Sequence, residues 1–136
     1  MITETRIPVR YAETDQMGIV HHSNYAVWFE AARTDFFAAL GYQYADMEDA
    51  GILLPLTDLM CSYKRPARYG QTVTIRTRIE RLTGVRIVFA YEAVAGESGE
   101  LLATGETRHA WTGPDLKPLN LKKKNPGVFA ALLGSV

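Results

Sequence analysis

The stretch from Tyr11 to Phe37, YAETDQMGIVHHSNYAVWFEAARTDFF, places an acidic residue, a glycine and two adjacent histidines directly before a long apolar-periodic segment. If that segment is a helix, its first turn offers unpaired N–H groups and the positive end of the helix dipole. A thioester or ester carbonyl at that end would have its developing oxyanion stabilised by the backbone. Asp15, on the preceding loop, would attack the carbonyl carbon or hold a water as general base. Gly18 would let the backbone turn tightly and approach a ligand. These parts suffice for acyl-transfer hydrolysis.

The same residues also allow plainer roles. An aspartate before a helix is most often an Asx-turn or capping residue, and HHSN is more often a polar helix start than a catalytic group. A metal site needs at least three well-placed ligands, but His21 and His22 are adjacent and His109 is far off in sequence, so we expect no metal. Cys61, within LMCSY, is expected to be a small buried apolar residue. Spacing alone leaves catalysis by Asp15 as the minority hypothesis.

One long helix would position the start of this constellation. From about Ser23, apolar residues recur at three- and four-residue steps, which indicates one buried stripe. Ser23 or Asn24 is the expected N-cap, and Gly41 is placed to end the helix. The buried stripe is predicted to contain Tyr25, Trp28, Phe29, Ala32, Phe36, Ala39 and Leu40.

The rest of the chain is predicted to be mostly β. Residues 71–82 alternate, with Val73, Ile75, Thr77 and Ile79 on one side, as in a half-buried antiparallel strand. Pro8 favours an edge or a bend. A strand, a long helix and four strands joined largely by hairpins predict a single α+β domain over residues 1–136. The predicted strands are 2–11, 54–68, 71–82, 85–94 and 100–112, with short helices in 44–51 and 128–133.

Composition narrows the function classes. The chain has 136 residues with 15 basic and 15 acidic side chains, which argues against a nucleic-acid binder. It contains no apolar run of roughly 18 residues, so no membrane span is expected. One cysteine and an N-terminus without an apolar secretory run favour the cytoplasm. Five strands and one main helix leave part of the sheet thinly covered, which favours a homodimer or homotetramer.

The segment ETDQMGIVHHSNY resembles the active-site motif of the 4-hydroxybenzoyl-CoA thioesterase-like group of the hotdog-fold superfamily. FEAARTDFF and YKRPARYGQTVTI extend the resemblance, which covers most of the chain and weakens after about Trp111. The positions that match at fixed spacing are Thr14, Asp15, Gly18, Ile19, Val20, His22 and Tyr25.

The resemblance implies a hotdog fold, in which a five-stranded antiparallel sheet wraps a long central helix and the protein dimerises. It also implies hydrolysis of acyl-CoA thioesters without a metal or redox cofactor. By position, Asp15 is the catalytic carboxylate, and the backbone N–H of His22 polarises the thioester carbonyl while its side chain assists. Tyr25 matches a position that contributes mainly packing, and we place it with Gly18 among the substrate-site residues. At His21 the family commonly carries a bulky aromatic, which leaves the shape of the acyl pocket open.

Coenzyme A carries several phosphates, so basic residues near the cleft mouth are expected to contact it. The candidates are Lys64, Arg65, Arg68 and Arg86, whereas the run Lys122–Lys124 is more typical of a solvated tail. Two rival classes are a hydratase or dehydratase on the same fold and a non-catalytic acyl-CoA-binding or regulatory module. The first places its histidine and acidic residue differently relative to the helix, and the second has no need of Asp15. The acyl group, the nucleophilic or general-base role of Asp15 and the choice between dimer and tetramer stay open.

Overall fold

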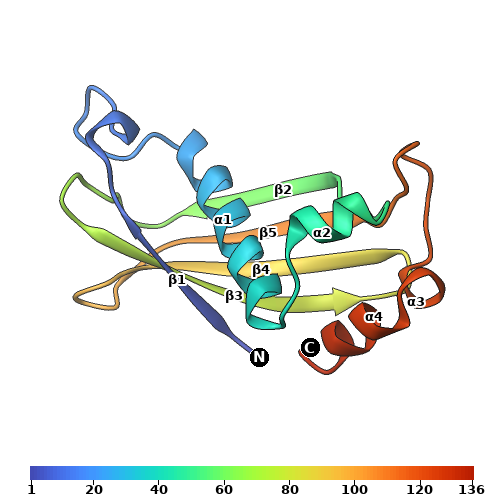
Figure 1. Cartoon of the computed structure of the whole chain (residues 1–136). Coiled ribbons are helices and arrows are strands. Elements are labelled where there is room, and N and C mark those ends of the chain that lie inside the picture. Colours follow the sequence, from blue (N-terminus) through green and yellow to red (C-terminus); the bar gives the residue numbers. More distant parts are fainter.

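A five-stranded antiparallel sheet curves around one long helix, α1, in the computed structural model, which describes all 136 residues (Figure 1). The strands follow the order β1-β3-β4-β5-β2 across the sheet. None of the helices is both long and apolar enough to span a membrane. The strands are β1 (Thr3–Pro8), β2 (Leu56–Tyr63), β3 (Thr72–Leu82), β4 (Arg86–Ala95) and β5 (Leu101–Ala110). The helices are η1 (Tyr11–Glu13), α1 (Ser23–Ala39), α2 (Tyr44–Asp49), α3 (Leu121–Lys124) and α4 (Pro126–Leu133).

The sheet connections follow the predicted hairpins in two cases and depart from them in a third. β3 pairs with β4 and β4 with β5, as expected, and β1 is an edge strand that ends at Pro8. β2 does not form a hairpin with β3; it pairs with β5, so that Cys61 lies opposite Gly105. The chain therefore leaves β2 at one edge of the sheet, and residues 64–71 cross the end of the sheet to reach β3 (Figure 1).

The long helix buries the predicted stripe with two changes. Phe37 is fully buried, whereas Ala39 is exposed and Leu40 is half-buried, because the helix ends at Ala39. Gly41 follows with a φ of +88°, the left-handed conformation expected of a helix stop. The other predicted stripe residues, Tyr25, Trp28, Phe29, Ala32 and Phe36, are buried. The alternation in β3 also holds, since Val73, Ile75, Thr77 and Ile79 are all buried.

α1 packs closely on the sheet because Gly105 has no side chain. The ring of Phe29 stacks on that of Tyr91, with centroids 4.4 Å apart and planes 10° from parallel. A Cβ atom at Gly105 would lie 2.4 Å from the Phe29 ring, a distance that would force the helix or the ring to move. Gly105 therefore sets how near the helix can lie to the middle of the sheet.

A chain of hydrogen bonds crosses the core beneath α1. His109 Nδ1 lies 3.4 Å from the Leu54 carbonyl, which can only accept, so neutral His109 carries its proton there and accepts at Nε2 from Thr107 Oγ1 at 2.8 Å. Thr107 in turn accepts from the Tyr91 hydroxyl at 2.7 Å, and Tyr91 accepts from Arg33 Nη1 at 3.1 Å. Each buried polar group in this chain thus has a partner, which is the condition for keeping a polar network in a core.

Glu13 ties the segment before α1 to the helix. Its Oε2 accepts from the Trp28 indole at 2.8 Å and its Oε1 from the Arg10 N–H at 2.8 Å. Its backbone carbonyl accepts from the N–H of His21 at 2.8 Å and from Asn24 Nδ2 at 3.0 Å. Burial raises the pKa of Glu13, but the hydrogen bonds to its carboxylate from Arg10 and Trp28, with the Arg10 charge, together outweigh burial and hold the pKa below its usual value. The carboxylate and carbonyl of one residue therefore close the loop 14–20 at its base.

We expect His109 to make stability depend on pH. Burial, with a further contribution from the Arg33 charge, lowers the pKa of His109 to about 4. The unfolded chain, with a histidine pKa near ~6.5, then binds more protons than the folded chain between these values, so stability falls as pH falls through this range. The free energy of unfolding should drop by roughly 2 kcal/mol more between pH 7 and pH 5 than in a His109→Gln variant. Urea unfolding at both pH values measures this difference, and an identical drop in the two proteins would contradict it.

Loss of the Glu13 carboxylate should weaken the fold because it leaves the Trp28 N–H buried without a partner. Glu13→Ala is expected to lower the free energy of unfolding by about 1–3 kcal/mol. The matched control is Glu80→Ala, which removes an exposed carboxylate paired with Arg78 and should cost no more than about 1 kcal/mol. Chemical denaturation of both variants tests the contrast, and equal small losses would show that Glu13 does not anchor the loop.

Candidate active site

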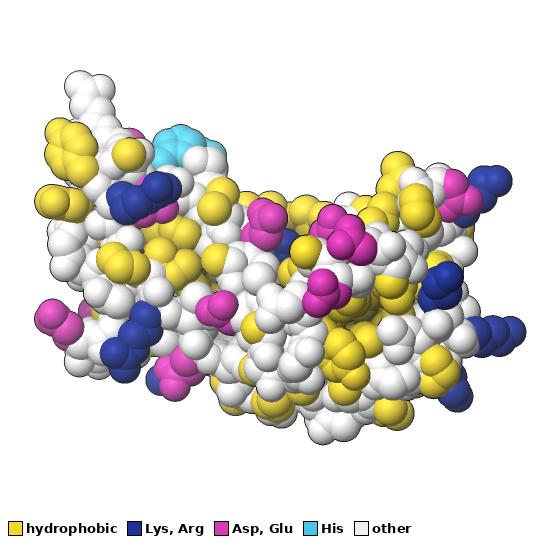
Figure 2. Space-filling view, viewed as in Figure 1, with side chains coloured by type: hydrophobic (Ala, Val, Ile, Leu, Met, Phe, Trp, Pro, Cys, Tyr) yellow, Lys and Arg dark blue, Asp and Glu magenta, His cyan; other side chains and the backbone are white.

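Asp15 and His22 line the same pocket, of about 360 Å³, at the N-terminal end of α1. Tyr25 from the helix forms another wall, and Tyr63, at the end of β2, faces it. Figure 2 shows the exposed histidine atoms at one raised end of the molecule, beside Lys/Arg and hydrophobic side chains. The structure thus brings together a carboxylate, an imidazole, a helix start and aromatic walls that lie up to about fifty residues apart in sequence.

The loop that carries Asp15 is a tight turn closed like a small hairpin. Thr14 and Val20 form an isolated antiparallel bridge, and the Asp15 N–H donates to the Ile19 carbonyl at 2.8 Å. The Gly18 N–H donates back to the Asp15 carbonyl at 2.9 Å. Gly18 has a φ of +77°, which favours glycine because a side chain is strained there. Gly18 therefore shapes the turn that aims Asp15 at the pocket.

Asp15 forms an Asx turn and also lines the pocket. Its Oδ1 accepts from the Met17 N–H at 2.8 Å, which is the Asx turn that is common before helices. Its Oδ2 accepts no hydrogen bond within the chain, and the half-buried carboxylate lines the pocket. One oxygen is thus held by the backbone while the other stays free, an arrangement that suits a nucleophile or a general base.

The N-cap lies one residue before the expected Ser23, because His22 occupies the N-cap position and Ser23 is the first helical residue. Neither Ser23 nor Asn24 caps the helix. The His21 ring accepts from the Ser23 N–H at 3.2 Å, and the His21 carbonyl accepts from the Asn24 N–H at 3.0 Å. The Tyr25 N–H donates to the His22 carbonyl at 3.3 Å. The N–H of His22 donates to no group within the chain, so it is the free donor at this helix end.

The two histidines have different positions. His21 stacks on His22 with ring centroids 4.0 Å apart, but only His22 lines the pocket. The departure from the family pattern at His21 thus falls on a capping residue. His109 is in the core under α1, and no group of three or more His, Cys, Asp or Glu side chains is arranged to hold a metal ion.

Tyr63 is a pocket residue that the sequence did not single out. It packs edge-on against Tyr25 with centroids 5.2 Å apart, and its hydroxyl donates to the His22 carbonyl at 3.4 Å. Burial raises the pKa of both tyrosines to about 12, so both are neutral phenols at pH 7. The alternation of Leu59, Cys61 and Tyr63 along β2, all on the helix side of the sheet, was the signal that would have identified it.

Cys61 lies beside these tyrosines but does not line the pocket. It is half-buried, so the expectation of a buried small residue is only partly met. Burial raises the pKa of its thiol, which keeps it protonated at neutral pH and unsuited to nucleophilic attack.

Three of the four basic candidates gather at this end of the molecule. Lys64 and Arg65 line the pocket, and Arg65 pairs with Glu100 at 3.1 Å. Arg68 Nη1 lies 3.9 Å from the position that a Cβ of Gly18 would take. Arg86 is in a different hollow, of about 320 Å³, at the opposite end of β4 from Ala95. Arg86 therefore does not line the Asp15 pocket of its own chain, contrary to the expectation.

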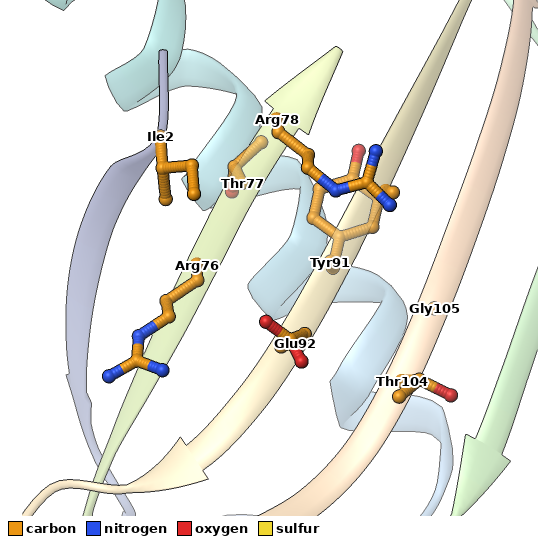
Figure 3. A pocket seen from close by; sticks show the side chains of 9 residues that line it. Ile2, Arg76, Thr77, Arg78, Tyr91, Glu92, Thr104 and Gly105 are labelled. Carbon is orange, nitrogen blue, oxygen red and sulfur yellow. The ribbon is translucent and has the colours of Figure 1, made fainter. Parts of the chain in front are cut away.

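Two further basic features lie elsewhere. Lys122–Lys124 are exposed, as expected of a solvated segment, but they lie in the short helix α3 and not in an irregular tail, at the far end of the sheet from the loop 64–71 (Figure 1). A hollow of about 310 Å³ lies on the sheet face away from α1. Figure 3 shows Arg76, Arg78 and Glu92 projecting into this region from β3 and β4. Neither feature contains a residue of the motif around Asp15.

Comparison with known proteins agrees with this geometry. Residues 9–121 match the family model described as the Thioesterase-like superfamily. The putative acyl-CoA thioesterase YneP of Bacillus subtilis is 41% identical over 126 residues, which cover 92% of this chain and 91% of that protein. The acyl-CoA thioester hydrolase YbgC of Escherichia coli O157:H7 is 29% identical over 87% of this chain and 90% of its own length.

Solved structures give the same family. The structure of a DHNA-CoA thioesterase from Staphylococcus aureus superposes with a TM-score of 0.93 at 42% identity, covering 98% of this chain and 89% of that one. A hypothetical protein from Thermus thermophilus superposes with a TM-score of 0.91 at 40% identity, over 100% and 98% of the two chains. The expected α+β hotdog fold is thereby confirmed, and the chain belongs to the thioesterase-like superfamily.

Proposed function

We propose that this chain hydrolyses an acyl-CoA thioester with Asp15 as the catalytic carboxylate and the N-terminal end of α1 as the group that polarises the carbonyl. Its membership of the thioesterase-like superfamily and its similarity to thioesterases identify the chain as an enzyme that hydrolyses acyl-CoA thioesters. The observation that carries the assignment of residues is that Asp15, with one carboxylate oxygen free, and His22, with its N–H free, line one pocket. The proposal includes a cytoplasmic location and no cofactor beyond the coenzyme A of the substrate.

The pocket can serve both halves of the reaction. The thioester oxygen, placed at the helix start, accepts from the His22 N–H and gains from the helix dipole as negative charge develops on it. Asp15 Oδ2 then either bonds to the carbonyl carbon, expelling the CoA thiolate and leaving an anhydride that water cleaves, or takes a proton from the attacking water. In both routes the Met17 N–H holds Oδ1, which fixes the plane of the carboxylate. The exposed His22 imidazole lies in the same pocket, where it can hand a proton to the leaving thiolate.

We further propose an aromatic acyl group. The two phenol rings of Tyr25 and Tyr63 and the apolar side chains of Ile19 and Val20 line the pocket. Planar rings pack well edge-to-face or offset against such walls. The similar structure from Staphylococcus aureus, a DHNA-CoA thioesterase, supports the same class of substrate.

The exposed edge of β2 supports a homodimer. Leu56, Leu59, Met60 and Tyr63 are 44–53% exposed on this strand, whose free edge presents unpaired backbone groups. A long apolar edge strand with a single charge, Asp58, is a template for pairing with another strand. We propose that β2 pairs with β2 of a second copy, so that the sheets of the two copies become continuous.

Asp15→Asn should lower thiol release from an aryl-CoA by a factor of roughly 10²–10⁴. Asparagine keeps an oxygen for the Asx turn, so the turn survives while the charge is lost. The matched control is Asp115→Asn, because Asp115 Oδ1 accepts from the Lys117 N–H at 3.0 Å in the same kind of turn, away from the pocket. Thiol release followed with Ellman's reagent compares the variants.

The same assay separates the alternatives. Near-normal turnover of Asp15→Asn would remove this carboxylate from the mechanism. Tight binding of acyl-CoA by the unchanged chain without thiol release would instead support a non-catalytic acyl-CoA-binding module. A panel of aromatic and straight-chain esters tests the acyl group, and faster cleavage of long alkyl esters would overturn the aromatic assignment.

Met60→Glu should convert the proposed dimer to a monomer. Met60 lies near the middle of β2, where an antiparallel two-fold pairing brings the two copies of the residue close together and like charges repel. Sedimentation velocity measures the mass, with Leu133→Glu, at a 56% exposed residue of α4, as the control that should stay dimeric. A monomeric unchanged chain, or a dimeric Met60→Glu variant, would contradict pairing through β2.

A further inference from the structure

Two exposed tyrosines meet at the end of the molecule that carries the Asp15 loop. Tyr11, in η1, and Tyr69, in the connection between β2 and β3, pack edge-on with ring centroids 5.7 Å apart and planes at 87°. They are 77% and 63% exposed, although aromatic side chains of this size usually bury most of their surface. The tyrosine pair (Tyr11 and Tyr69) therefore presents open ring faces to solvent, held in place by each other.

The segment that carries Tyr69 is fixed beside the Asp15 turn. The Ala67 carbonyl accepts from the Val20 N–H at 2.8 Å, which joins this segment to the far side of the Asp15 loop. The guanidinium of Arg68, the residue before Tyr69, lies alongside Gly18 in that loop. Arg68 and Tyr69 thus belong to a segment that is bonded to the Asp15 loop, next to the pocket residues Lys64, Arg65 and Pro66.

The cations on the segments next to the Asp15 loop differ in whether a carboxylate already pairs with them. Arg10 and Arg65 are paired with Glu13 and Glu100, respectively. Lys64 and Arg68 form no ion pair with any carboxylate of the chain. Two exposed, unpaired cations on the segment that also carries an exposed aromatic ring, beside the Asp15 pocket, suit an anionic linker that ends in a planar ring.

We propose that the tyrosine pair binds the adenine ring of the substrate's coenzyme A, with Lys64 and Arg68 on the phosphates that precede it. This inference rests on the proposed function and names the part of the substrate that lies outside the catalytic pocket. Coenzyme A has this order of groups: a thioester, a flexible pantetheine arm, a pyrophosphate and a 3′-phosphorylated adenosine. Adenine stacks on aromatic side chains through its π-face, and such contacts are individually strong. An acyl group on a carrier protein lacks the adenine, so the tyrosine pair selects the free coenzyme ester.

The test compares two thioesters of one aromatic acid, one with coenzyme A and one with N-acetylcysteamine, which has no nucleotide. Tyr11→Ala and Tyr69→Ala should each lower the ratio of kcat/KM for the CoA ester to that for the short ester by about tenfold. Tyr69→Phe keeps the ring and should restore the ratio. Leu116→Ala, which truncates a residue that is 66% exposed elsewhere, is the control for loss of exposed apolar surface.

The phosphate contacts have their own matched pair. Arg68→Gln should lower the same ratio and flatten the rise of KM with salt, because it removes an unpaired cation. Arg65→Gln removes a cation already paired with Glu100, so it should change the ratio and the salt dependence of KM less than Arg68→Gln does. A larger effect at Arg65 than at Arg68 would overturn this assignment of the phosphate contacts.

Each remaining outcome decides the proposal. An unchanged ratio in both tyrosine-to-alanine variants overturns it, and so does an equal loss on both esters, which would assign the pair to loop structure. If the unchanged chain cleaves neither ester, the proposed function fails on its own. Calorimetric titration with adenosine 3′,5′-bisphosphate then tests the tyrosine pair by itself. Binding that Tyr69→Ala abolishes supports a nucleotide site at the pair, and absence of binding by the unchanged chain overturns that site.

Discussion

The contact between Phe29 and the backbone of Gly105 fixes the distance between helix and sheet on which the site depends. Phe29 has no exposed surface, stacks on Tyr91 and fills the space that a side chain at position 105 would need. Tyr25 precedes Phe29 by one helical turn and so points along the same face, into the pocket. Trp28, next to Phe29, reaches Glu13 on the other side of the Asp15 loop. A shift of α1 at Gly105 would therefore reach the pocket wall and the anchor of its loop together.

The two explanations of Asp15 are compatible because a carboxylate has two oxygens. The Asx turn uses Oδ1 and leaves Oδ2 free, so the turn orients the group that the chemistry needs. The helix start is arranged in the same way: the His21 ring and carbonyl accept from the Ser23 and Asn24 N–H groups, while the His22 N–H stays free. Local capping thus satisfies the donors that would otherwise need water and leaves free the one N–H that the proposed mechanism uses. The structure has no conflict between stability and the proposed chemistry here.

Sequence reasoning succeeded where one element's own period determines burial. The stripe of α1 and the alternation of β3 follow from contacts on a single face, and the motif around Asp15 lies within one local turn. It failed where burial depends on a distant partner. Glu13, a charged residue at the end of η1, is buried against Trp28, which lies 15 residues further along the chain and donates to it. The edge position of β2 likewise arises because β2 pairs with β5 and not with β3. The alternation of residues within β2 does not determine which strand it pairs with.

The pocket and the proposed dimer edge share a strand, and this links assembly to the site. Tyr63 ends β2, lines the pocket and hydrogen-bonds the carbonyl of His22, the residue whose N–H is free. In a lone chain β2 is held by β5 on one side only, and edge strands open more readily than central ones. Pairing of the free edge would hold Tyr63 against the helix start and so keep the aromatic wall in place. The apolar edge that risks aggregation in isolation thereby becomes, in the proposed assembly, a support for the pocket.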